Sequence, residues 1–218
     1  MTRLVPNRFL FSFEFPLRYR ANAPRLDGDV DKWSDEELLP RLGELDGARD
    51  FADVWACWNE SGLFAACRIT GKRAALRCDP AAWWKSDNLR LCTDMRDVRS
   101  LRRGTRYCQQ FYFLPTGGGR NGKEPTGGMG IVQRARESAP SVDVSQLRVA
   151  ACVNPDGYSL EAHVPTACLC GFDPVDHPRI GLYYMLEDRE LGQQYLTVGD
   201  DLYWFVDPST WPTAVLGR

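Results

Sequence analysis

The chain has 218 residues, of which 44% are hydrophobic and 26% charged, as in an ordinary globular protein that can bury a core without disulfides. Its formal net charge of -2 argues against a general nucleic-acid binder, and no apolar run is long enough for a membrane helix. We expect a single domain over residues 1–218, with residues 1–23 as an N-terminal strand extension, and neither nucleic-acid nor membrane partners.

Strand-like segments follow one another along the chain, rich in aromatic or β-branched residues and bounded by Gly, Pro, Asn or Asp. The turn sequences Asn59-Glu60-Ser61-Gly62 and Asn154-Pro155-Asp156-Gly157 each separate two of these segments and predict hairpins. The predicted strands are residues 8–15, 53–59, 62–70, 88–93, 107–114, 147–153, 158–164, 180–187 and 194–198.

Helical patterning is weak and is limited to residues 34–42 and a turn near residues 166–170. The composition of residues 116–130 predicts a mobile glycine-rich loop. This loop resembles a phosphate-binding loop, but Glu124 follows Lys123 where Ser or Thr is needed, so nucleotide binding is not expected. Many short strands with regular turns predict an all-β fold, a jelly-roll-like antiparallel β-sandwich with short helical turns.

Candidate catalytic and metal-binding groups are few. The only two histidines, His163 and His177, lie on the polar face of a predicted strand and in a turn, and no GxSxG or HExxH motif occurs. Glycosidase carboxylates pair in space rather than in sequence, and nothing singles out a pair. We predict that the protein is not an enzyme. The acidic stretch of residues 27–31 predicts a turn-forming loop, with calcium as the alternative, although the Glu that closes an EF-hand is absent.

The eight cysteines include no CxxC pair, so the sequence indicates no zinc site. Five of them lie in apolar strand-like segments, where a free thiol packs as a small hydrophobe, and disulfides are the alternative; these are Cys57, Cys67, Cys92, Cys108 and Cys152. A basic run is interpreted as a solvated hairpin loop, with an acidic ligand or anionic polysaccharide as the alternative; it contains Arg96, Arg99, Arg102, Arg103 and Arg106.

Charges and prolines interrupt the first 20 residues, whereas a signal peptide needs a continuous apolar stretch. We therefore expect a cytoplasmic protein, or a secreted one if a leader has been removed. Among the seven tryptophans, Trp83 and Trp84 are adjacent. Because neighbours on a strand point to opposite faces, one of these two rings is expected to be exposed.

Seven short motifs occur in the order found in family 9 carbohydrate-binding modules and their DOMON-like relatives. The opening segment, PRLDGDVDKW at residues 24–33, resembles the family's P-x-hydrophobic-D-G-x-hydrophobic-D-x-x-W pattern. The others are VWACWN with GLF at residues 54–64, WKSDNLRLCTD at 84–94, QFY at 110–112, GYSLEAHVP at 157–165, IGL with Asp188 at 180–188, and DPSTW before Leu216 at 207–216.

The resemblance implies a β-sandwich that binds a sugar non-covalently between two aromatic rings. By motif position the first ring is Trp84 and the second is Phe205, with Trp204 beside it. Gln110 is kept, whereas Arg90 stands in place of an acidic residue and Tyr112 in place of a basic one. Because a guanidinium can only donate hydrogen bonds, Arg90 favours a ligand with carboxylate or sulfate groups. The predicted ligand-binding residues are Trp84, Arg90, Gln110, Tyr112, Trp204 and Phe205.

Two alternatives to a sugar-binding module stay open. The first is an interaction or scaffold domain that kept the sandwich but lost the sugar site. The second is a haem-binding domain like some DOMON-like relatives, which use Met and His as axial ligands. The sequence does not indicate an oligomeric state.

Overall fold

The computed structural model describes residues 13–42, 49–197 and 199–218. No helix among these residues is long and apolar enough to cross a membrane. The strands are β1 (Glu14–Tyr19), β2 (Ala52–Asn59), β3 (Gly62–Thr70), β4 (Asn88–Asp94), β5 (Cys108–Gly118), β6 (Glu124–Gly130), β7 (Arg148–Asn154), β8 (Gly157–Pro165), β9 (Arg179–Asp188), β10 (Gly192–Tyr195) and β11 (Thr213–Leu216). The helical elements are short 3₁₀ segments: η2 (Asp35–Glu37), η4 (Pro80–Lys85), η5 (Val144–Gln146), η6 (Thr166–Cys168), η7 (Asp200–Leu202) and η8 (Pro208–Thr210).

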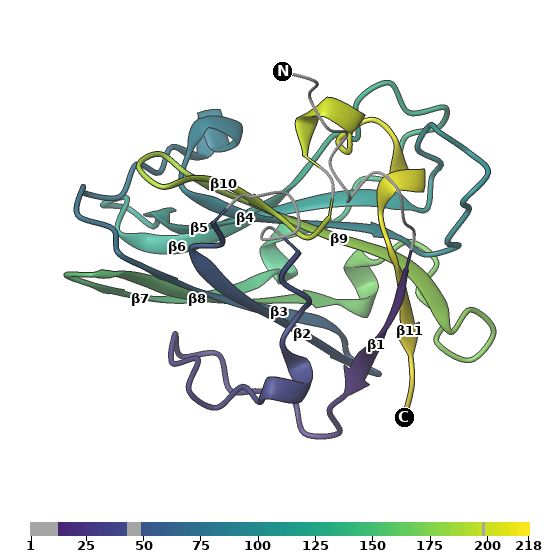
Figure 1. Cartoon of the computed structure of the whole chain (residues 1–218), viewed down its shortest axis with the longest axis horizontal. Coiled ribbons are helices and arrows are strands. Elements are labelled where there is room, and N and C mark those ends of the chain that lie inside the picture. Colours follow the sequence, from purple (N-terminus) through teal and green to yellow (C-terminus); the bar gives the residue numbers. More distant parts are fainter. Residues whose placement is uncertain (1–12, 43–48, 198) are drawn as a thin grey trace, which may run out of the picture.

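The strands form two layers that β1 joins. One layer has the order β6-β5-β4-β9-β11-β1, with β10 also paired to β9, and the other has the order β1-β2-β3-β8-β7. β1 pairs in parallel first with β11 and then with β2, whereas the other strand pairs described are antiparallel. In Figure 1, β4, β5, β6, β9 and β10 lie above β2, β3, β7 and β8, with β1 and β11 together at one side. This arrangement confirms the predicted β-sandwich.

Both predicted hairpins are present. Asn59 pairs with Gly62 across a two-residue turn, and Asn154 pairs with Gly157 across another. Each turn needs its glycine, because the backbone φ angles are +138° at Gly62 and +156° at Gly157. A Cβ atom at these positions would also come within 2.1 Å and 2.0 Å of a carbonyl oxygen on the neighbouring strand.

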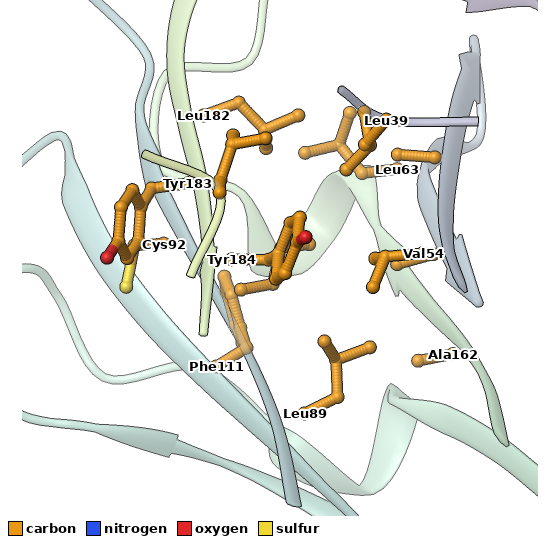
Figure 2. Close-up of a cluster of buried hydrophobic side chains, with 14 of the residues drawn as sticks. Leu39, Val54, Leu63, Leu89, Cys92, Phe111, Ala162, Leu182, Tyr183 and Tyr184 are labelled. Carbon is orange, nitrogen blue, oxygen red and sulfur yellow. The ribbon is translucent and has the colours of Figure 1, made fainter. Parts of the chain in front are cut away.

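The main hydrophobic core lies between the two layers. Because side chains alternate along a strand, Leu89 and Phe111 point inward from one layer and Ala162 from the other. Figure 2 shows these residues on one side of β4 and β9, whereas Tyr183 and Cys92 lie on the other side. A second buried cluster covers the outer face of β2 and β3; it contains Val30, Trp33, Trp55, Cys57, Phe64 and Ala66.

The glycine-rich stretch is largely strand, so the prediction of a mobile loop is wrong. Its first residues end β5, and residues 124–130 form β6, which pairs with β5. The glycines of β6 leave room for large rings that lie across the strand. A Cβ atom at Gly128 would be 2.4 Å from the Tyr112 hydroxyl oxygen, and one at Gly130 would be 2.6 Å from the Trp83 ring. Composition indicated flexibility, but the packing of these rings determines the conformation.

Other boundaries differ near the chain ends and around residue 38. The first described strand is β1 rather than residues 8–15, of which residues 8–12 lie outside the described residues, as does Val198 of another predicted strand. The helix predicted over residues 34–42 is only η2, because Leu38 adopts an extended backbone and forms a bridge to Trp55 of β2. The predicted turn near residues 166–170 is confirmed as η6, and β11 was not predicted.

A buried carboxylate organises the acidic loop of residues 27–31. Glu161 on β8 accepts hydrogen bonds from the backbone N–H groups of Asp27 (3.0 Å) and Gly28 (2.8 Å). It also accepts from the Lys32 ammonium (3.0 Å) and the Trp33 indole (3.0 Å). Among the described residues, no group of three or more His, Cys, Asp or Glu side chains is placed to hold a metal ion. The carboxylate accounts for the shape of this loop.

We expect Glu161→Gln to lower the free energy of unfolding by about 1–3 kcal/mol, because the amide NH₂ cannot accept these hydrogen bonds and Lys32 loses a charged partner. Urea denaturation measures the change. Glu124→Gln, at the exposed start of β6, is the control and should change stability by less than about 0.5 kcal/mol. Equal stability of the two variants would contradict the structural role of Glu161.

All eight cysteines are free thiols. Of the five expected in the core, Cys152 is instead exposed, because β7 is the edge strand of its layer and this residue faces outward. Burial raises the pKa of the Cys57, Cys67 and Cys92 thiols, and it raises the pKa of Cys108 to about 11. These thiols are therefore protonated at neutral pH and pack as hydrophobic groups.

Candidate functional site

The outer face of the layer that contains β4, β5 and β9 carries polar and aromatic side chains. The pairing register places Arg90 of β4 between Tyr112 of β5 and Met185 of β9. Two residues along the same strands, Gln110 and Tyr183 flank β4 in the same way. Alternate residues of each strand fill the core, and the side chains named here are the others, so they point away from the core.

Two segments fold over this face, and each is held by stacked rings. Trp83 in η4 lies parallel to Tyr112, with ring centroids 4.4 Å apart and an interplanar angle of 2°. Trp204, which follows η7, stacks on Tyr183 at 5.2 Å and 22°. The Trp204 indole N–H also donates to Asp200 at 2.8 Å. These contacts place the two segments as opposite walls of a depression on the sheet.

Arg90 links the two walls. Its guanidinium carbon lies 5.2 Å from the centroid of the Trp83 ring and 5.9 Å from that of Trp204. Its Nε donates to Asn88 Oδ1 at 3.0 Å, and its Nη2 donates to the Trp84 carbonyl oxygen at 2.8 Å. Burial lowers the pKa of Arg90, and an arginine nevertheless stays charged at neutral pH. Two of the N–H donors of this guanidinium are therefore used within the protein.

Between the walls lies a cavity of about 760 Å³, a size typical of small-molecule sites. The Trp84 ring, 50% exposed, forms part of its rim. Phe205 lies edge-on to Trp204 with ring centroids 5.8 Å apart, and Trp204 itself is only 1% exposed. Further lining comes from Met129, Gly130, Ile131, Gln133, Met185 and Gln193.

Three polar side chains in the cavity could bind a ligand. The Gln110 amide makes no hydrogen bond with any residue that the structure describes. Glu187 Oε2 accepts from the Gln193 amide at 2.7 Å and lies 3.8 Å from Arg90 Nη2. Asp200 contributes a second carboxylate. The cavity thus combines apolar ring surfaces with both hydrogen-bond donors and acceptors.

The structure brings five of the six predicted site residues into this one cavity: Trp84, Arg90, Gln110, Trp204 and Phe205. Tyr112 is not among its lining residues, because Trp83 covers its ring. Contact of these residues with a ligand stays a prediction.

One of the two adjacent tryptophan rings is exposed, as expected, but strand alternation is not the cause. Trp83 and Trp84 belong to η4 rather than to a strand, so strand alternation does not set their directions. The rings are perpendicular, with centroids 6.1 Å apart. Trp83 turns onto the sheet because it stacks on Tyr112, and this leaves Trp84 at the rim.

Sequence reasoning missed Trp83, Glu187 and Asp200. Glu187 had a usable signal, because residues 183, 185 and 187 alternate within a predicted strand and share one face. Asp200 had none, since it reaches the cavity from the short 3₁₀ helix η7, which the sequence did not predict. The two histidines do not line this cavity. His163 stacks on Phe64 at 4.2 Å on the other layer, and burial lowers its pKa.

Comparison with known proteins supports the fold assignment. No protein-family model and no curated protein matches the sequence. Among solved structures, a family 9 carbohydrate-binding module from Caldicellulosiruptor kristjanssonii in complex with cellotriose matches with a TM-score of 0.66 and 16% identity, covering 94% of this chain and 95% of that one. Its complex with glucose matches with a TM-score of 0.67 and 16% identity, covering 94% and 97%.

A proposed carbohydrate-binding protein from Bacteroides uniformis ATCC 8492 matches with a TM-score of 0.61 and 10% identity, covering 95% of this chain and all of that one. These similarities show that the chain has the fold of family 9 carbohydrate-binding modules. They extend over nearly the whole of each chain. At identities this low, the structural similarity establishes the fold alone, and the ligand has to be argued from the site.

Proposed function

We propose that this protein is a non-catalytic module that binds a sugar in the cavity between Trp84 and Phe205. The observation that carries the proposal is the exposed ring of Trp84 beside a Gln110 amide that has no partner among the described residues. A flat ring suits the apolar C–H face of a pyranose, while nearby polar groups bind its hydroxyls. The structural neighbours in complex with cellotriose and with glucose support this ligand class.

Glu187 can supply the carboxylate that the family pattern has at position 90, where this chain has Arg90. Its carboxylate lies on the adjacent strand β9, within 3.8 Å of the Arg90 guanidinium, and lines the same cavity. Asp200 adds another acceptor. Sugar hydroxyls can therefore donate to Glu187 and Asp200, while Arg90 supports the walls. These two carboxylates favour an uncharged sugar unit inside the cavity rather than the acidic unit that Arg90 by itself indicated.

Calorimetric titration with glucose and cellotriose, extended to a glycan array, tests the proposal. We expect Trp84→Ala to weaken binding by at least about tenfold, because a ring that stacks on the ligand contributes more than its neighbours at the rim. Val153→Ala is the matched control, since Val153 is also exposed, at 53%, but lies on β7 in the other layer. Its affinity should equal that of the wild type.

Failure of the wild type to bind any glycan would contradict the proposal and favour the scaffold alternative. Equal binding by wild type and Trp84→Ala would show that the sugar binds outside this cavity. An absorption spectrum of the purified protein checks the haem alternative, which requires a Soret band. Incubation with the bound glycan should release no shorter sugars, and hydrolysis would contradict the non-catalytic role.

A further inference from the structure

An arginine-rich surface adjoins the cavity. It is built by residues 95–107, between β4 and β5, and residues 131–137, which follow β6. These two loops contain seven arginines and only two acidic residues, Asp97 and Glu137, in a chain whose net charge is -2. The arginines are Arg96, Arg99, Arg102, Arg103, Arg106, Arg134 and Arg136.

The two loops are packed against each other. The Arg136 backbone N–H donates to the Gly104 carbonyl at 2.7 Å, and Arg103 Nε donates to the Arg134 carbonyl at 2.9 Å. Gly104 allows this approach, because a Cβ there would be 3.0 Å from the Val132 side chain. The positive charges are therefore presented by a defined surface.

Several of these guanidinium groups are available to a ligand. Arg102 and Arg136 are exposed, and their side chains make no hydrogen bond or ion pair with any described residue. Arg106 is 3.8 Å from Glu137, but the two side chains are 50% and 57% exposed, so the pair is weak. Arg106 and Arg136 also line a second depression of about 560 Å³, next to Tyr107.

Both loops of the arginine-rich surface begin or end within a few residues of the cavity. Ile131 and Gln133 line the cavity, and Arg134 and Arg136 follow them in the same loop. On the other loop, Arg106 is four residues from Gln110, so their Cα atoms are at most about 14 Å apart. A short oligosaccharide could span both regions.

We infer that the ligand is an anionic glycan, with an uncharged unit in the cavity and neighbouring units whose carboxylate or sulfate groups bind the arginine-rich surface. This inference rests on the proposed sugar-binding function. Glu187 and Asp200 disfavour an acidic unit inside the cavity, whereas Arg102, Arg106 and Arg136 favour acidic units beside it. Guanidinium groups bind carboxylate and sulfate through charge-assisted hydrogen bonds.

Two matched pairs of probes test the inference and separate the two anions. The first pair is a xylohexaose and the same oligosaccharide with glucuronate side groups; the second is a sulfated galactan oligosaccharide and its desulfated form. At about 20 mM salt, we expect the charged member of at least one pair to bind about tenfold more tightly, and at about 500 mM salt screening should remove most of this preference.

The variant Arg102→Gln/Arg136→Gln should lose this preference and keep the wild-type affinity for the neutral oligosaccharide. The matched control is Arg120→Gln/Lys123→Gln, which removes the same charge from the exposed β5–β6 turn, and it should keep the preference. Both variants replace exposed side chains, so neither should impair folding.

Equal binding of neutral and charged glycans would overturn the inference and leave the proposed function intact. Binding of charged glycans that needs the arginines but not Trp84 would overturn the inference that one glycan occupies both the cavity and the arginine-rich surface. Absence of all glycan binding would overturn both the inference and the proposed function. A DNA duplex that binds as tightly as the charged glycan would assign the arginine-rich surface to nucleic acid and overturn the inference.

Discussion

Lys72→Met is expected to lower the free energy of unfolding by about 3–5 kcal/mol, because it leaves buried carboxylates without their cation. The ammonium of Lys72 lies 3.0 Å from Asp188 Oδ1 and 3.3 Å from Asp87 Oδ2. All three side chains are at most 3% exposed. Asp87 also accepts from the backbone N–H groups of Arg77 and Arg189, so the cluster joins the segment before η4 to the β9–β10 turn.

Urea denaturation of Lys72→Met and of Lys123→Met, an exposed control in the β5–β6 turn, measures this effect. The control should change stability by less than about 0.5 kcal/mol. Comparable stability of the two variants would show that the buried cluster contributes little.

The pH dependence gives a second measurement. Burial acts to lower the pKa of Lys72, but its hydrogen bond to Asp188 and the nearby carboxylates outweigh burial, so the pKa is raised. The stabilisation is therefore complete below the ordinary pKa of 10.5 and is lost as pH rises through the raised value. As the pH rises through this value, the difference between wild type and Lys72→Met should shrink.

Arg90→Lys is expected to lower the free energy of unfolding by about 2–4 kcal/mol and to weaken cellotriose binding by at least about tenfold. A lysine keeps the charge, but it cannot donate to both Asn88 and the Trp84 carbonyl while lying between the Trp83 and Trp204 rings. Near-UV circular dichroism of the tryptophans, together with calorimetry, measures both consequences.

Arg120→Lys, in the exposed β5–β6 turn, is the control for the same chemical change and should resemble the wild type in both measurements. If Arg90 served mainly as a positive charge facing the ligand, Arg90→Lys would keep most of the affinity. That result would contradict the positioning role assigned to its guanidinium.

Local patterns in the sequence were sufficient for most of the strands. Segments rich in aromatic or β-branched residues, and turns that begin with Asn and end with Gly, depend on neighbouring residues, so β3 and the hairpins at Gly62 and Gly157 were predictable. β6 was not, because its glycines have low strand propensity and the strand depends on rings from Tyr112 and Trp83.

The order of the motifs was sufficient to bring Trp84, Arg90 and Gln110 together as candidates, because motif order follows the order of strands in a shared fold. The motif order could not show whether each residue contacts a ligand or supports the walls of the cavity. Whether a guanidinium faces a ligand or holds a wall depends on its hydrogen-bond partners, and those of Arg90 come from Asn88 and Trp84.

By itself, the sequence determined an all-β sandwich and the approximate place of an aromatic site, since both follow from short-range patterns and their order. Only the tertiary structure decided that Trp83 stacks on Tyr112, that Glu187 supplies a carboxylate beside Arg90, and that the two arginine-rich loops pack against each other. The physical reason is that these contacts join strands and loops distant in sequence, whose spacing is set by sheet register and packing.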